Sequence, residues 1–120
     1  MSKHPFPHER LDAWHVARRA RVLVYRFTKT LPPGFGDESR QLNNAAASVV
    51  RNIGEGANRY RPAEKVHKFE IAGGEAGEAV SSMESLLDLE VGEAELAREA
   101  ITLEGRVAAM MTGLIRRHRR

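Results

Sequence analysis

A line of polar side chains recurs at steps of three and four residues between positions 41 and 59. This spacing places them on one face of a helix, where short amides and hydroxyls can be half-buried and hydrogen-bond to a neighbouring helix. We interpret part of the line as a polar seam that orders helix packing, in which Glu55 and Glu78 accept hydrogen bonds. Their expected donors are Arg59, Asn52 or backbone N–H groups. A recognition surface is the alternative interpretation. The polar seam consists of Ser48, Asn52, Glu55, Arg59 and Glu78.

Lysine and arginine side chains gather in three parts of the chain and could bind phosphate groups. They are Arg18, Arg19, Arg21, Arg26 and Lys29; then Arg59, Arg61, Lys65 and Lys68; then Arg116, Arg117, Arg119 and Arg120. Phosphate neutralisation releases counterions and needs no base readout, so such patches would bind RNA or DNA non-specifically and in a salt-sensitive way. A solvated helix face gives the same pattern, and both interpretations stay open. Only Tyr60 lies among the second group, so base stacking is a minor expectation.

No residue set suits catalysis. The chain has no cysteine, no Gly-x-Ser-x-Gly motif and no phosphate-binding loop. Glu64 and His67 form a single Glu-x-x-His pair, whereas a di-iron site in a helical bundle needs two such pairs and further glutamates. We interpret Trp14, Tyr25 and Phe69 as core or interface anchors. We therefore expect no catalytic residues, no metal site, no cofactor and no enzymatic activity.

Charge is distributed unevenly along the chain. Residues 1–68 hold 13 Lys/Arg and 6 Asp/Glu, for a net charge of +7, whereas residues 69–115 hold 2 and 10, for −8. This asymmetry indicates either a basic face for polyanions or charge-complementary packing between halves or subunits. The length of 120 residues predicts one domain. No run approaches the roughly 18 apolar residues of a membrane span, so we expect a cytoplasmic protein.

Apolar residues with helical spacing predict four helices, at about 11–31, 38–57, 62–90 and 93–118,. Asp37 is the expected N-cap of the second helix. Residues 1–10 should form a flexible N-terminal arm, because Pro5 and Pro7 punctuate it. The short loops between the helices predict an all-α, antiparallel up-down-up-down four-helix bundle over residues 11–118.

The last predicted helix has a wider apolar arc than one bundle interior needs. Its main stripe is Leu96, Ala100, Leu103, Val107, Met110 and Leu114, and the flanking residues are Ile101, Ala108, Met111 and Ile115. The excess apolar surface favours a subunit interface, and therefore a homo-oligomer.

Several ordered motifs carry a family resemblance. Ser48, Asn52-Ile53-Gly54-Glu55-Gly56 and Arg59 fit the pattern Ser-x-x-x-Asn-Ile-Ala-Glu-Gly-x-x-Arg. Further matches are Leu11-Asp12-Ala13-Trp14, Ala17, Val24-Tyr25, Thr28-Lys29, Leu31-Pro32, and Ala72, Gly74 and Glu78. From about residue 11 to residue 115 the chain resembles the four-helix-bundle proteins of bacterial 23S rRNA intervening sequences, which include the accessory variability proteins of diversity-generating retroelements. Gly54 and Glu75 depart from the usual alanine and serine.

This resemblance implies a homopentameric barrel of four-helix protomers. It also implies nucleic-acid binding or service to a reverse transcriptase. With the arginine-rich patches, it leads us to expect a non-enzymatic oligomer that binds RNA or DNA non-specifically, with a reverse transcriptase or another protein as a further partner. The alternative is a structural or adaptor protein that binds a protein partner without nucleic acid.

Overall fold

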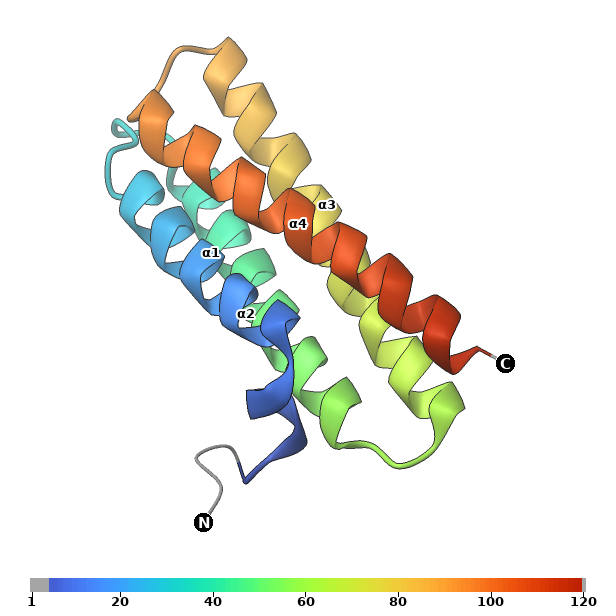
Figure 1. Cartoon of the computed structure of the whole chain (residues 1–120). Coiled ribbons are helices and arrows are strands. Elements are labelled where there is room, and N and C mark those ends of the chain that lie inside the picture. The colour runs from blue at the N-terminus through green and yellow to red at the C-terminus, as the bar shows by residue number, and fades with distance from the viewer. Residues whose placement is uncertain (1–4, 120) are drawn as a thin grey trace.

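The structure is a computed structural model that describes residues 5–119. Figure 1 shows its four long helices and a short 3-10 helix. The elements are η1 (Pro7–Arg10), α1 (Asp12–Thr28), α2 (Gly36–Asn58), α3 (Pro62–Asp88) and α4 (Ala94–His118). The described part of the chain contains no strand, and the predicted all-α class with four helices is confirmed.

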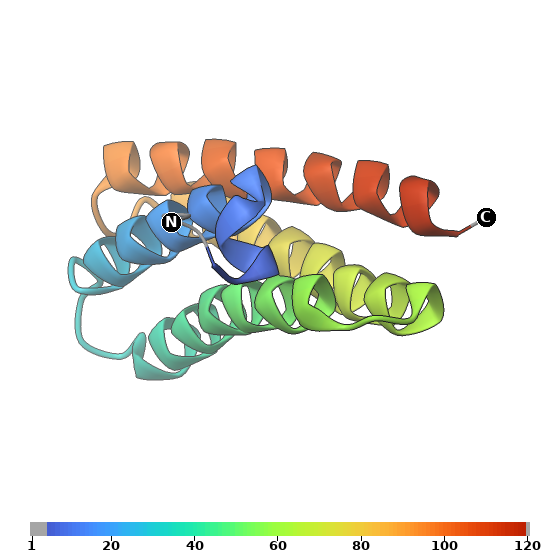
Figure 2. The ribbon, with the colours of Figure 1, turned by 60° about the horizontal axis from the view of Figure 1, so that its bottom comes forward.

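Each long helix packs against two others. Consecutive helices are in contact, and α1 also packs against α4, which closes the group around a shared interior (Figure 2). The molecule measures 44 × 32 × 20 Å along its principal axes. No helix within residues 5–119 combines the length and the apolar character that a membrane span requires.

The helix ends differ from the sequence-based bounds by up to three residues. The first helix ends at Thr28 rather than at residue 31, because the hydroxyls of Thr28 and Thr30 donate to the carbonyls of Tyr25 and Phe27 and close the last turn. The second helix begins at Gly36, with Phe35 at the N-cap position that was predicted for residue 37. The last two helices begin or end within two residues of prediction, which is the usual disagreement at fraying ends,.

Glycine is required in the turn between α3 and α4. Gly92 has a φ of 75°, a left-handed conformation that favours glycine,. A Cβ atom there would lie 2.8 Å from the ring of Phe27. The Thr30 hydroxyl also accepts a 2.8 Å hydrogen bond from the backbone N–H of Glu93, so this turn is fastened to the end of α1.

The segment predicted as a flexible N-terminal arm contains a short 3-10 helix. Residues 1–4 lie outside the described residues, whereas Pro7–Arg10 form η1, which packs on α1 and α2. The ring of His8 lies edge-on to Trp14, with 4.6 Å between ring centroids, and its Nδ1 atom is 2.9 Å from the amide nitrogen of Asn58. These contacts place η1 against α1 and α2, and the flexibility predicted for residues 1–10 stays a prediction.

The buried side chains form two clusters, one toward each end of the bundle. One contains Ile53, Phe69, Val107 and Met111, and the other contains Phe27, Leu42, Met83 and Ala100. Glu104 lies on α4 between residues of the two clusters, one turn from each, and is 0 % exposed. Within residues 5–119, neither of its carboxyl oxygens has a hydrogen-bond partner. Burial raises the pKa of Glu104 to about 8.

Candidate nucleic-acid interface

A groove of about 930 Å³ runs between α1 and α2. It collects three of the predicted phosphate-binding residues, because α1 turns its alanines, Val16 and Val24 inward and therefore its arginines outward,. The apolar side chains between the two walls come from both helices. The lining residues are His15, Arg18, Arg19, Arg21, Val22, Tyr25, Asn43, Asn44, Ala47 and Val50.

Among the described residues, the arginines of this groove have no acidic partner. Arg18, Arg19 and Arg21 are exposed, and no carboxylate within residues 5–119 forms an ion pair with any of them. The guanidinium carbon of Arg18 lies 4.5 Å from the ring centroid of Trp14, an arrangement that orients the group but leaves its charge uncompensated,. We call this set, Arg18, Arg19 and Arg21, the groove arginines.

Tyr25 lies in the same groove and is 53 % exposed. The amine of Lys29, the residue that follows α1, is 4.7 Å from the centroid of the Tyr25 ring. Tyr25 is therefore not a core anchor, and its alternative role as an interface anchor stays a prediction, whereas Phe69 is 1 % exposed and belongs to the core. The sequence contains a sign of this exposure. Tyr25 directly follows the buried Val24, so on a helix it points away from the buried face of α1.

The second group of basic residues is largely engaged within the fold. The Lys68 amine is 2.8 Å from a carboxyl oxygen of Glu55, and both Arg59 and Arg61 lie within 4 Å of Glu64. Lys65 donates hydrogen bonds of 2.9 and 3.2 Å to the carbonyls of Ala57 and Gly56. Those carbonyls carry the negative end of the α2 dipole, so Lys65 stabilises the helix terminus.

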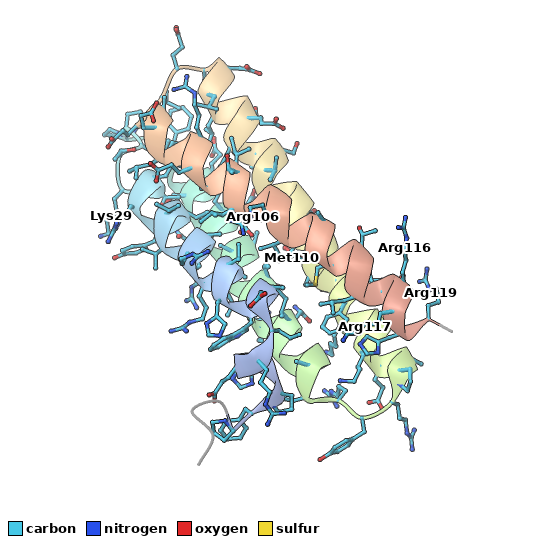
Figure 3. The ribbon with its side chains drawn as sticks, in the orientation of Figure 1. Lys29, Arg106, Met110, Arg116, Arg117 and Arg119 are labelled. Carbon is cyan, nitrogen blue, oxygen red and sulfur yellow. The ribbon has the colours of Figure 1, made fainter. Side chains whose placement is uncertain are left out.

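The third group lies at the C-terminal end of α4. Figure 3 shows Arg116, Arg117 and Arg119 there, at the opposite end of the molecule from Lys29. The Arg119 guanidinium is 2.6 Å from a carboxyl oxygen of Glu70 and so joins the end of α4 to α3. Arg120 lies outside the described residues. The third group therefore lies far from the Lys29 end of the first group. It lies close to the second group, because burial first and then the charge of Lys65 lower the pKa of His118. Arg106, midway along α4, is exposed and was not among the predicted residues.

The polar seam has different hydrogen bonds from those predicted. Asn52 is buried and donates within its own helix, to the carbonyl and the hydroxyl of Ser48 at 2.9 and 3.0 Å. Glu55 pairs with Lys68 rather than with Arg59 or Asn52, and this hydrogen bond is the largest of the contributions that lower the pKa of Glu55.

Glu78 belongs to a separate groove of about 490 Å³ between α2 and α3, which Ser48 and Arg51 also line. Its neighbour there is Glu75, whose pKa is raised by burial first and then by the charge of Glu78 and a hydrogen bond with it. Arg59 is not among the residues that line this groove. The five seam residues thus belong to at least two separate hydrogen-bonded groups and do not form one continuous line.

The single Glu-x-x-His pair of the sequence, Glu64 and His67, has other surroundings in the fold. Glu64 faces Arg59 and Arg61, and His67 is exposed. Within residues 5–119, the His, Asp and Glu side chains form no group of three or more that could hold a metal ion.

Comparison with known protein families gives one match. The family described as 23S rRNA-intervening sequence protein matches residues 9–113, a range that includes the groove between α1 and α2. No curated protein matches the sequence.

Proposed function

Because this chain belongs to the 23S rRNA-intervening sequence protein family, we propose that it is a non-enzymatic protein that binds RNA or DNA through the groove between α1 and α2. The groove arginines would contact phosphates without reading base sequence. Binding of this kind is dominated by the release of counterions and weakens as salt rises.

The observation that supports this proposal is the difference between paired and unpaired cations. Arg40, Arg61 and Arg98 are each within 4 Å of an acidic side chain three residues away, whereas the groove arginines have no such neighbour within residues 5–119. An unpaired guanidinium beside a concave surface attracts a polyanion more strongly than one whose charge a carboxylate already compensates.

The proposal extends to assembly and partners. We propose that the helices alternate in direction in an antiparallel up-down-up-down bundle, and that the protomers form a homopentameric barrel in the cytoplasm. A ring would repeat the groove on every protomer, and one long nucleic acid could then contact several grooves, so that weak contacts add through avidity. A reverse transcriptase is the protein partner that fits such an accessory role in a diversity-generating retroelement.

A second candidate is an adaptor that binds a protein and no nucleic acid. The exposed Val22 and the apolar residues Ala47 and Val50 of the groove support it, because apolar area combined with arginine is typical of protein interfaces,. Such binding would depend less on salt than binding to a polyanion does.

A titration of fluorescein-labelled RNA and DNA, followed by anisotropy, tests the proposed function. The variant replaces all three groove arginines with alanine, and its matched control replaces Arg40, Arg61 and Arg98, which removes the same charge from ion-paired positions. The groove variant should lose most of its affinity for nucleic acid. The negative slope of log K against log salt should become shallower by about 2. Equal losses in both variants would contradict a role for the groove, and no binding at low salt would favour the adaptor.

A further inference from the structure

We propose that the groove between α1 and α2 takes a single strand of nucleic acid, with Tyr25 as the surface on which a base stacks and the groove arginines as phosphate contacts. This inference rests on the proposed function and names its ligand class. The proposed function involves contacts to phosphates alone, whereas this inference also assigns part of the groove to contacts with the bases.

The groove contains aromatic and apolar side chains in addition to its arginines. Non-specific contacts to a duplex require only cations, yet the groove also holds an exposed aromatic ring and apolar side chains from both helices. Proteins that bind single strands combine a positive groove for the backbone with aromatic side chains for the bases. The groove arginines and Tyr25 bring these two elements onto one helix, within two turns.

Tyr25 has the exposure that stacking requires. More than half of its surface is accessible. The Lys29 amine lies over one face of the ring, 4.7 Å from its centroid, so a base would stack on the opposite face and Lys29 would add a cation beside it. On the α2 wall, the exposed Asn44 presents an amide that can both donate to and accept from the edge of an unpaired base,. Asn43 is less available, because its amide donates to the Thr28 hydroxyl and the Ser39 carbonyl.

A duplex cannot use this combination. Its bases are stacked on each other and paired, so their faces are closed to a tyrosine side chain, and it offers the groove mainly phosphates. A single strand exposes base faces and can bend to follow a groove between two helices. The geometry therefore favours single strands over duplexes of the same length.

The test compares fluorescein-labelled oligo-U, oligo-dT and a mixed-sequence duplex, each of about 20 nucleotides, by anisotropy with the full chain. Tyr25→Ala should weaken binding of the single strands about tenfold and leave duplex binding nearly unchanged. Tyr25→Phe should keep most of the affinity, because it retains the ring. Tyr60→Ala is the matched control, since Tyr60 is 97 % exposed and lies outside the groove. Circular dichroism verifies the fold of each variant.

The outcomes separate this inference from the proposed function. If the native protein binds duplex and single strands equally, or if Tyr25→Ala and Tyr60→Ala have the same effect, the single-strand inference is wrong while arginine-dependent binding still stands. If no nucleic acid binds at low salt, the proposed function fails as well.

Fluorescence of Trp14 gives a second readout of binding. Arg18 lies 4.5 Å from the centroid of the Trp14 ring, and a phosphate that draws this guanidinium away should change the emission of Trp14.

Discussion

Replacing Glu104 with glutamine should stabilise the protein at neutral pH, by an amount that grows as the pH rises. The carboxyl group is fully buried between the two core clusters, and within residues 5–119 it has no hydrogen-bond partner and no oppositely charged neighbour. Desolvation is therefore the cause that raises its pKa from 4.5 to about 8,.

The magnitude follows from proton linkage. The unfolded chain releases the Glu104 proton above its ordinary pKa of 4.5, whereas the folded chain holds it until about 8. Between these values the unfolded state binds fewer protons, so the free energy of unfolding falls by about 1.4 kcal/mol for each pH unit. At pH 7 the accumulated loss is about 3 kcal/mol. Glutamine cannot ionise, so the Glu104→Gln variant should avoid this loss.

Urea unfolding followed by circular dichroism at several pH values, with the protein concentration held constant, measures this difference. The two proteins should differ little near pH 4.5 and diverge until pH 8. Glu99→Gln is the control, because Glu99 is exposed on the same helix and its substitution should have no such trend. A difference that is independent of pH, or a wild-type protein that is the more stable at pH 7, would refute the reasoning.

Two glycines of α2 should respond in opposite directions to alanine. Gly54→Ala should raise the free energy of unfolding by up to about 1 kcal/mol through helix propensity, because its Cβ would lie 3.7 Å from the indole nitrogen of Trp14, an ordinary contact. Gly56→Ala should lower it by about 1–3 kcal/mol, because its Cβ would lie 2.7 Å from the ring of the buried Phe69. Thermal or urea unfolding measures both, and a stabilised Gly56→Ala variant would contradict the packing that we describe.

The sequence predicts the helices of this protein better than its candidate site. Helical spacing identified all four long helices because each buries a regular apolar stripe,. The same reasoning missed Glu104, although positions 97, 100, 104, 107 and 111 keep the three-and-four spacing of the buried residues of α4. A charged residue in such a stripe is usually assigned to solvent, and only the packing of neighbouring helices shows that it is enclosed.

Ion pairing explains why the candidate site could not be located from the sequence. Lys68 and Glu55 lie on different helices, and nothing in their spacing indicates that one neutralises the other. The lysines and arginines at 59–68 and those at 18–21 therefore look equivalent in the sequence. In the fold, Arg59, Arg61 and Lys68 lie within 4 Å of acidic side chains, whereas the groove arginines have no acidic partner within residues 5–119.

The fold excludes one explanation for the uneven distribution of charge along the chain. No ion pair within residues 5–119 joins residues 5–68 to residues 69–115. Pairing between the two halves of one protomer therefore does not account for the asymmetry, and the remaining explanations are a basic face or contacts between copies. The exposed acids Glu84, Asp88 and Glu99 lie on α3 and α4, whereas the groove arginines lie on α1. A polyanion would be repelled from the first surface and attracted to the second, so the charge distribution itself would direct nucleic acid toward the groove.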